Sequence, residues 1–286
     1  MNRGRRAFDA LVVGGGTSGA AAAAFLAEAG LHTALVERRR LDDAGASWIN
    51  AVPAWMFDRA GVEAPAPPER HGIFGRGSFR SPLDRASIDL EDVAAWDVDM
   101  RALGARLRRR AAAAGVHAFE RTRVEDVQVA GGRVRALEVR GEESGPFRLE
   151  AALVVDASGR GGAVRRRVPE LRRDCPQVGA TDTCTAAASL HRIADVSGAQ
   201  EFLARHRLRP GRAITWMGLA GGFSSLIVSM DEEVRSVSLV TGTIADGHHP
   251  SGPALLARAL REHPWIGERI SGGRGLIPLR RSFDRL

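Results

Sequence analysis

The chain has 286 residues, of which 44% are apolar and 26% are charged, so it can bury one large core or two ordinary ones and lacks the composition of a disordered protein. It contains no lysine and no tyrosine, which excludes mechanisms that need a Schiff-base lysine, a phosphate-loop lysine or a tyrosine base. Its formal charge of +7 rests on arginines that are scattered along the chain and not interleaved with aromatic residues, so no nucleic-acid partner is predicted.

The N-terminal segment imitates a signal peptide, because several arginines precede an alanine-rich stretch. Asp9, the glycines at 14–16 and Glu28 interrupt any apolar core of such a peptide, so we predict neither a signal peptide nor stable membrane insertion. The two cysteines, Cys175 and Cys184, are too few for a disulfide framework and are expected to be buried small side chains. A reducing cytoplasm is the predicted location.

The first elements predict a βαβ unit. Residues 8–13 form an apolar run typical of a buried parallel strand, and the alanine-rich segment 18–29 is typical of a helix that ends at Gly30. A second strand is predicted at 31–37. Together these elements span about thirty residues, which predicts an α/β protein with a Rossmann-like nucleotide-binding domain.

The middle of the chain is less regular. Residues 38–98 carry few periodic runs and many glycines, prolines and tryptophans, which predicts long loops around a site. A helix is predicted at 99–114, where Leu103, Leu107 and Ala111 recur at intervals of four. Short strands are expected to follow it at 116–121, 123–129, 133–140 and 149–156.

From Cys175 onward the pattern becomes that of antiparallel strands. These strands are predicted at 180–193, 212–218, 223–230 and 234–243, with a helix at 253–263. We therefore predict two domains. The first is a nucleotide-binding domain at 1–170 with a loop insertion at about 40–98, and the second is an antiparallel-sheet substrate domain at 171–286.

A glycine-rich motif, GxGxxG, lies between the first predicted strand and the first helix. Gly14 permits a tight turn, Gly16 lets the backbone approach a pyrophosphate, and Gly19 lets the helix pack closely. The N–H groups at the helix start, including those of Thr17 and Ser18, would attract phosphate oxygens together with the helix dipole. This context predicts a dinucleotide site.

Glu37 ends the second predicted strand, where a carboxylate accepts hydrogen bonds from the ribose hydroxyls of adenosine. Because a carboxylate repels a 2′-phosphate, the nucleotide is predicted to be FAD or NAD rather than NADP. Arg38 opens a run of three arginines with two interpretations: a solvated charge run, or a role beside the adenine or pyrophosphate.

Three sequence segments carry a family resemblance: the motif at 14–37, the run Asp-Met-Arg-Ala-Leu at 99–103, and the run Val-Val-Asp-Ala-Ser-Gly-Arg at 154–160. In order and spacing they resemble the FAD-dependent superfamily that contains aromatic hydroxylases, geranylgeranyl reductases and flavin halogenases. The resemblance implies FAD as the cofactor, with Arg101 contacting its phosphates and the strand around Val124 lying against adenine. A guanidinium at a helix start also suits a diphosphate on chemical grounds.

The third segment departs from the second flavin motif of the hydroxylases. Ser158 stands where that motif has an acid, and Gly162 stands where it has a serine. The resemblance still implies that Ser158 and Gly159 approach the ribityl or phosphate groups of FAD, since glycines permit close backbone approach. The departures favour the reductase-like and halogenase-like branches over a simple aromatic hydroxylase.

The subclass is left open. The halogenase signature, a catalytic lysine with Trp-x-Trp-x-Ile-Pro, has no match, and neither has the early Cys-Gly-Gly of the prenyl reductases. The third flavin motif of the family, Gly-Asp-Ala-Ala at a helix start, has no match either, whereas residues 276–281 resemble the segment that precedes it. We therefore expect the 286 residues to be a truncated version of a longer flavoprotein.

The resulting hypothesis is an FAD-dependent oxidoreductase, reductase- or dehydrogenase-like, that acts on a small organic substrate. The alternatives are a flavin monooxygenase and a truncated nucleotide-binding remnant without activity. NAD(P)H stays open as a transient electron donor, and neither a catalytic side chain nor an oligomeric state is predicted.

Other candidate groups have plainer interpretations. Trp48, Asn50 and Trp55 could form a substrate wall or flavin contact, or simply pack within a long loop. The histidines at 248–249 and the acidic run at 231–233 are predicted to be turns rather than metal ligands.

Overall fold

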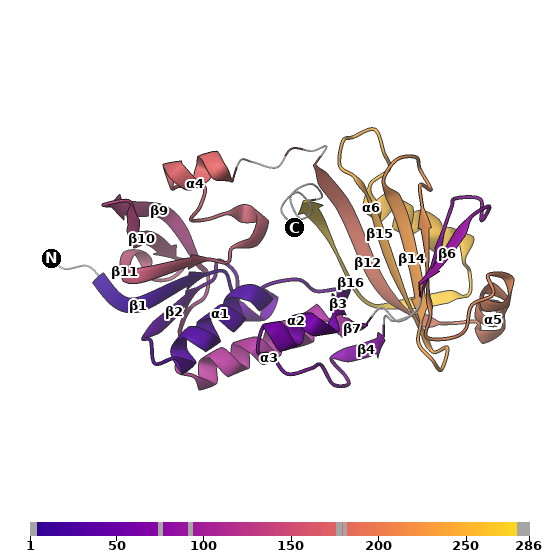
Figure 1. Cartoon of the computed structure of the whole chain (residues 1–286), viewed down its shortest axis with the longest axis horizontal. Coiled ribbons are helices and arrows are strands. Elements are labelled where there is room, and N and C mark those ends of the chain that lie inside the picture. Colours follow the sequence, from indigo (N-terminus) through magenta and orange to yellow (C-terminus); the bar gives the residue numbers. More distant parts are fainter. Residues whose placement is uncertain (1–4, 74–76, 91–93, 176–178, 180–181, 279–286) are drawn as a thin grey trace. The chain divides into compact units, whose positions relative to one another are not determined.

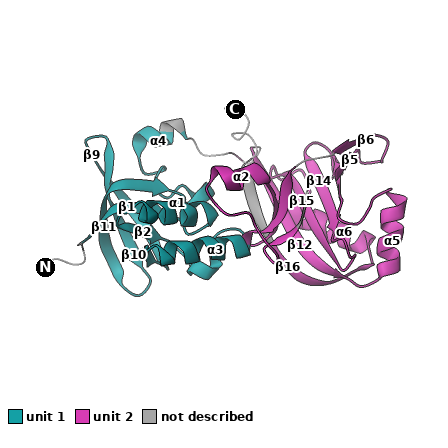
Figure 2. Ribbon diagram, turned by 60° about the horizontal axis from the view of Figure 1, so that its bottom comes forward, with its two compact units in different colours: residues 1–46, 101–177 teal, residues 47–100, 178–286 magenta. Residues whose placement is uncertain are grey.

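Figure 1 shows the computed structural model of the chain, which describes residues 5–73, 77–90, 94–175, 179 and 182–278. The chain divides into two compact units (Figure 2). Unit 1 comprises residues 1–46 and 101–177, and unit 2 comprises residues 47–100 and 178–286. The segment predicted as a loop insertion of the first domain falls mostly in unit 2, because its strands pair within the sheets of that unit.

Unit 1 is built on a six-stranded sheet with the order β8-β2-β1-β11-β10-β9. The first four of these strands run parallel, and β10 and β9 continue the sheet antiparallel. The elements of the unit are β1 (Arg5–Val13), α1 (Thr17–Glu28), β2 (Thr33–Val36), η1 (Leu41–Asp43), α3 (Met100–Ala113), β8 (His117–Phe119), β9 (Thr122–Ala130), β10 (Arg133–Gly141), β11 (Gly145–Asp156), η2 (Gly159–Gly161) and α4 (Pro169–Asp174). The predicted mixed α/β fold is confirmed.

The central strands of unit 1 are buried on both faces, which explains their continuous apolar sequences. Leu11 and Val13 pack on one face with side chains of β9 and β10, and Val12 packs on the other face with Ala23 of α1 and Ala111 of α3. Small alanines let both helices lie close to the sheet. Since β1, β2 and β11 are parallel and in register, their carboxyl ends meet at one edge of the sheet.

Unit 2 contains two sheets. The larger has seven strands in the order β16-β12-β15-β14-β13-β5-β6, and the smaller has three in the order β3-β7-β4. The elements of the unit are β3 (Ile49–Pro53), α2 (Ala54–Arg59), β4 (Arg70–Ile73), β5 (Gly77–Arg80), β6 (Ser87–Leu90), β7 (Ala95–Asp99), β12 (Thr183–Ile193), α5 (Val196–Arg205), β13 (Ala213–Met217), β14 (Ser224–Met230), β15 (Ser236–Ile244), α6 (Gly252–Glu262) and β16 (Ile266–Pro278).

One face of the seven-stranded sheet forms the hydrophobic core of unit 2. Val237 and Leu239 of β15 are fully buried there with Phe202 of α5 and Ala259 of α6. The strands alternate, so the other face carries half-buried residues such as Ser238. That second face is available to line a site.

The structure corrects the predictions for several segments. Long loops were predicted over residues 38–98, but residues 49–99 contain the five strands β3–β7 and the helix α2. Each of these elements has four to six residues, too few to show a period in the sequence. Neither α5 nor β16 was predicted, and the glycines of β16 weaken its strand pattern. Cys184 is buried as predicted, but Cys175 is exposed.

Two further features concern turns and membranes. The acidic run at 231–233 does form a turn, between β14 and β15, in which Val234 adopts a positive φ of 55°. Among the described residues, no helix combines the length and the apolar character needed to cross a membrane.

Candidate functional site

The glycine-rich turn between β1 and α1 leaves no room for side chains. Gly14 has a φ of +110°, and a Cβ on it would overlap the carbonyl group of Ala157. A Cβ on Gly19 would in turn overlap the carbonyl oxygen of Gly14. The turn therefore brings the first and second predicted motifs into contact, because Ala157 directly precedes Ser158 at the end of β11.

The N-terminus of α1 suits a phosphate group. The helix begins at Thr17, directly after Gly16, and no side chain caps it. Its first turn carries no acidic residue, so the partial positive charge of the helix end is not offset by a carboxylate there. The N–H of Gly14 donates to the carbonyl oxygen of Val36, so Gly14 and Gly19 shape the turn through their lack of a side chain. With the backbone N–H groups of Gly16, Thr17 and Ser18 they form a cradle that fits the diphosphate of a dinucleotide.

Glu37 lies beside this turn and is only 6% exposed. Its Oε2 accepts a hydrogen bond from the N–H of Gly15 at 2.7 Å, and its Oε1 accepts one from the N–H of Arg39 at 2.9 Å. Each carboxylate oxygen can accept more than one hydrogen bond, so capacity remains for a ribose hydroxyl. The predicted ribose contact stays a prediction, and the structure adds a second role, which is to hold Gly15 in place.

The other predicted cofactor residues differ in exposure. Arg38 is exposed, and Arg101 is exposed in the first turn of α3. Because the dipole of a helix disfavours a cation at its N-terminus, an anion bound near Arg101 would relieve an unfavourable interaction. Val124 is 8% exposed and packs in the core of unit 1, so only the backbone of β9 is left to contact adenine there.

The loop after β11 is organised by Asp156, which the sequence reasoning passed over. Its carboxylate accepts hydrogen bonds from the N–H groups of Ser158, Val164 and Arg165, and from the hydroxyl of Ser158 at 2.5 Å. Burial alone would raise the pKa of Asp156, but these hydrogen bonds and the Arg165 guanidinium outweigh it, so the pKa lies below its ordinary value.

The side chain of Ser158 forms hydrogen bonds within this loop. Its hydroxyl donates to Asp156 and accepts from the N–H of Ala163 at 2.7 Å. Gly159 has a φ of +64° with open space around it, so its backbone is accessible. The N–H of Ser158 also donates to Asp156, and the carbonyl oxygen of Gly159 accepts from Gly162 and Arg165, so a cofactor contact here would rest on the N–H of Gly159. The position of Asp156 in the sequence, at the end of an apolar strand and just before Ala157 and Ser158, was the signal that could have indicated its role.

Arg108 is a second residue that the sequence reasoning missed. It lies in α3 and is 9% exposed, and its Nη1 donates to the carbonyl oxygens of Gly15 and Ala44 at 3.3 Å each. Burial lowers the pKa of the Arg108 guanidinium, and the carboxylates of Asp42 and Glu37 partly offset that effect. In the sequence it was one of several arginines at polar positions of a helix, so nothing distinguished it.

Unit 2 contains a cavity of about 590 Å³ between residues of its two sheets. The floor includes Leu190, Ser238 and Ser229, which lie opposite one another on β12, β15 and β14. The three-stranded sheet contributes Asp97 and other side chains from β3, β4 and β7. A cavity of this size accepts a small organic molecule.

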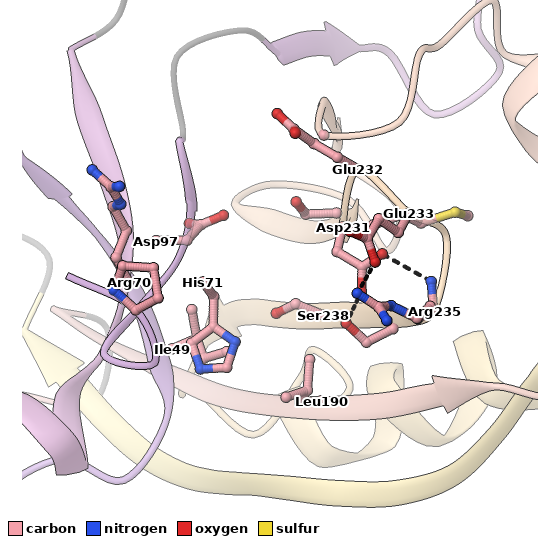
Figure 3. Close-up of a pocket in the computed structure, with 15 residues that line it drawn as sticks. Ile49, Arg70, His71, Asp97, Leu190, Asp231, Glu232, Glu233, Arg235 and Ser238 are labelled. Carbon is pink, nitrogen blue, oxygen red and sulfur yellow. Dashed lines mark hydrogen bonds and ion pairs between the residues drawn. The ribbon is translucent and has the colours of Figure 1, made fainter. Parts of the chain in front are cut away.

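Charged side chains face the cavity from both sides. Figure 3 shows Asp97 and His71 pointing into it, opposite Asp231 and Arg235. Asp231 is already occupied, because it accepts hydrogen bonds from the N–H of Arg235 and the hydroxyl of Ser236. Asp97 has no hydrogen-bond or ion-pair partner among the described residues, and burial raises its pKa to about 6. Its carboxyl group is therefore available to a ligand.

The predicted aromatic wall is only partly assembled. Trp48 lies with Ile49 against Leu190 and Ser238 of the seven-stranded sheet, next to the cavity. Trp55 is 56% exposed and stacks with Arg59, and Asn50 is exposed.

The histidines at 248–249 lie in a turn organised by Asp246. The Asp246 carboxylate accepts hydrogen bonds from the N–H groups of His248 and His249, and its Oδ2 lies 2.9 Å from Nδ1 of His249. These interactions, led by the N–H of His249, lower the pKa of Asp246 to about 2. Within the described part of the chain, no group of three or more histidine, cysteine, aspartate or glutamate residues could hold a metal ion.

Comparisons with known proteins agree with this geometry. A family model described as an FAD binding domain matches residues 7–238. Thiamine thiazole synthases of Thermococcus kodakarensis and Methanoculleus marisnigri are 29% and 33% identical over 169 and 170 residues, 56% of this chain in both cases. The chain spans 61% and 60% of the length of these two relatives.

Solved structures show the same fold at low sequence identity. A geranylgeranyl bacteriochlorophyll reductase-like protein of Thermoplasma acidophilum has a TM-score of 0.75 at 17% identity, over 96% of this chain and 67% of that one. A myxobacterial chondrochloren halogenase has a TM-score of 0.62 at 20% identity, over 96% and 64%. A mutant of the halogenase PltM in complex with FAD has a TM-score of 0.63 at 17% identity, over 95% and 60%.

The neighbours are of the kinds that the sequence motifs resemble, and the family match includes the glycine-rich turn, Glu37 and the Asp156 loop. The chain belongs to the FAD binding domain family, and it shares its fold with a geranylgeranyl bacteriochlorophyll reductase-like protein and with FAD-dependent halogenases.

Proposed function

We propose that this chain acts as an FAD-dependent oxidoreductase of the reductase or dehydrogenase type on a small, polar organic substrate. The observation that carries the proposal is the cradle formed by Gly14, Gly16 and the N-terminus of α1, beside the buried carboxylate of Glu37. Such a cradle fits a diphosphate, and a carboxylate at the end of β2 fits an adenosine ribose without a 2′-phosphate.

The diphosphate, the ribose and the ribityl chain of FAD then each have a place. The backbone N–H groups of Thr17 and Ser18 would hold the diphosphate, and Arg101 would add charge near it. Glu37 would accept hydrogen bonds from the ribose, and the backbone around Gly159 would approach the ribityl chain. When bound, FAD supplies the acceptor or donor of a hydride or of electrons.

The cavity of unit 2 supports a polar substrate. Ser229 and Ser238 offer hydroxyl groups, and Asp97 offers a carboxyl group without a partner among the described residues. With a pKa of about 6, Asp97 is mostly ionised at pH 7, and it is a stronger base than an ordinary aspartate, so it can accept a proton from a bound substrate. We infer that this cavity binds the substrate and that Asp97 contacts a polar group on it.

A flavin monooxygenase is the second candidate. The solved halogenases support it only as far as they share the fold of this chain. The absence of any lysine argues against a halogenase, and the second flavin motif departs from that of the hydroxylases at Ser158. A reductase takes its electrons from a donor, for which NAD(P)H is our proposal.

The first test is a titration of the purified chain with FAD, followed by flavin fluorescence. Glu37→Ala removes a carboxylate that both fixes the turn and accepts hydrogen bonds, so FAD should bind more weakly by about 1.5–3 kcal/mol. Glu142→Ala is the matched control, because this glutamate of unit 1 is exposed and pairs with Arg121 at the surface. Equal affinity of the wild type and Glu37→Ala for FAD would show that the adenosine does not bind at this site.

The second test separates the two enzyme classes. Bound FAD is mixed anaerobically with NADH or NADPH, and its visible absorption is followed. If NADH or NADPH bleaches the flavin and a reducible substrate restores its absorption without oxygen, the result supports a reductase. If only oxygen restores the absorption, and the substrate is hydroxylated, the result would instead establish the monooxygenase.

A further inference from the structure

One buried guanidinium joins two segments that surround the nucleotide cradle. Nη1 of Arg108 lies 3.3 Å from the carbonyl oxygen of Gly15, in the turn between β1 and α1, and 3.3 Å from that of Ala44, in the segment after β2. The same two segments touch directly, since a Cβ on Gly16 would lie 3.4 Å from Cα of Gly45. Arg108 therefore bridges the turn and the segment 41–46 from the side of α3.

Gly15 is fastened at both of its backbone polar groups. Its N–H donates to Glu37 at 2.7 Å, and its carbonyl oxygen accepts from Arg108. A peptide held at both ends has little freedom to rotate, so the direction of the neighbouring N–H groups is set before any ligand binds. The carboxylate and the guanidinium act on opposite sides of one residue.

The sequence of α3 provides the space for this side chain. Gly104 lies one turn before Arg108, and a Cβ on it would lie 3.0 Å from Nη1. That distance is shorter than ordinary van der Waals contact, so a Cβ at 104 would require the guanidinium to move by a few tenths of an ångström, which would lengthen hydrogen bonds that are already 3.3 Å long. Arg109, the next residue, is exposed and has no such environment.

The charge of Arg108 is balanced locally. The carboxylates of Asp42 and Glu37 both stabilise its charged form against the cost of burial. A buried guanidinium without such partners would be strongly destabilising, so the arrangement needs all three side chains together.

We propose that Arg108 is a positioning residue that clamps the glycine-rich turn against the segment 41–46 and thereby sets the affinity for the adenosine half of FAD. The proposal rests on the proposed FAD site and adds a residue to it. Arg108 acts through Gly15 and Ala44, so its effect should appear in the backbone of the protein even without ligand.

The test compares Arg108→Met with the matched control Arg109→Met. Amide hydrogen exchange of the ligand-free proteins is measured at residues 14–19 and 41–46, and dissociation constants are measured for FAD and for ADP. In Arg108→Met both segments should exchange faster, and both ligands should bind about tenfold or more weakly, the loss expected for a hydrogen bond to a charged group. Arg109→Met should match the wild type.

Two further variants separate geometry from charge. Arg108→Lys keeps the charge but cannot present the planar set of donors, so it should behave like Arg108→Met rather than like the wild type. Gly104→Ala keeps Arg108 and improves helix propensity, yet it should weaken FAD binding by displacing the guanidinium. The Gly104→Ala variant also serves if Arg108→Met fails to fold.

The outcomes are distinct. Unchanged FAD and ADP affinity in Arg108→Met would overturn the proposal, and so would weakened binding with unchanged exchange, because that pattern means direct contact rather than positioning. If the wild type binds no FAD, the proposed function fails. The exchange data then still decide whether the clamp exists: faster exchange in Arg108→Met supports it, and unchanged exchange refutes it.

Discussion

The nucleotide cradle of unit 1 and the cavity of unit 2 are formed by different parts of the polypeptide chain. The cradle is made mainly of backbone, from residues that lie close together in the sequence and meet at the carboxyl edge of a parallel sheet. The cavity is made of side chains from six strands that are widely separated in the chain. A backbone site is sensitive to added atoms, whereas a side-chain site is sensitive to charge and protonation, and each kind can be tested by the matching change.

The largest effect is expected where a side chain is added to the cradle. Gly19→Ala places a Cβ on top of the carbonyl oxygen of Gly14, and the backbone there cannot move without separating α1 from β1. Although alanine favours helices, we expect a loss of about 3 kcal/mol or more in the free energy of unfolding of unit 1 and loss of FAD binding. Circular dichroism and FAD titration measure both.

Gly161→Ala is the control for this change. A Cβ on Gly161 meets nothing within 4 Å, so stability and FAD affinity should stay near those of the wild type. An equal loss in both variants would show that the contrast between crowded and open glycines is not what governs the cradle.

The second effect concerns charge in the cavity. Burial raises the pKa of Asp97 to about 6, so the free energy of unfolding of unit 2 should fall as the pH rises from about 4 to 6, while Asp97 is protonated in the folded state and ionised in the unfolded one. Asp97→Asn removes this dependence and should be more stable than the wild type by about 3 kcal/mol at pH 7.

Tryptophan fluorescence reports this directly, because all five tryptophans lie in unit 2. Urea titrations at pH 4 and pH 7 should show that the advantage of Asp97→Asn is present at pH 7 and absent at pH 4. An advantage of the same size at both values would mean that ionisation of Asp97 is not its origin.

The stability of unit 1 should depend on pH in the opposite direction, because of Asp156. The pKa of Asp156 lies below its ordinary value, so its contribution to stability is present above about pH 4, the pKa of an unfolded aspartate, and is lost as the pH falls through its folded pKa. Asp156→Asn loses acceptors for N–H groups of the loop and should be less stable by about 2 kcal/mol at pH 7. The difference from wild type should shrink below pH 4 in circular dichroism melts.

The smallest effect comes from two threonines on the core face of β15. The hydroxyl of Thr243 is buried and has no hydrogen-bond partner among the described residues, whereas that of Thr241 donates to the carbonyl oxygen of Gly252 at 2.6 Å. Thr243→Val should therefore stabilise unit 2 by about 1 kcal/mol, and Thr241→Val should destabilise it by a similar amount. Shifts of the same sign in urea titrations would contradict this assignment.

The same contrast explains how much the sequence could predict. Periodicity and the glycine spacing indicated β1, α1 and β2 with the position of Glu37, because local sequence determines a turn and its helix. The burial of Arg108 depends on Gly104 and on the carbonyl oxygen of Ala44, which no local pattern of arginines reveals. The cavity depends on which strands pair, and β3–β7 are too short to be recognised before that pairing is known.

The order of strands in unit 1 also bears on how the protein is made. β1 lies between β2 and β11, and Arg5 pairs with Arg148, so β1 leaves the ribosome well before the strand with which it pairs. Until β11 emerges, an apolar strand edge stays open on the nascent chain, where pairing with other chains and chaperone binding compete. Nascent chains that stop before residue 145 should therefore have a protease-sensitive unit 1, and chains that include Asp156 should acquire resistance in one step.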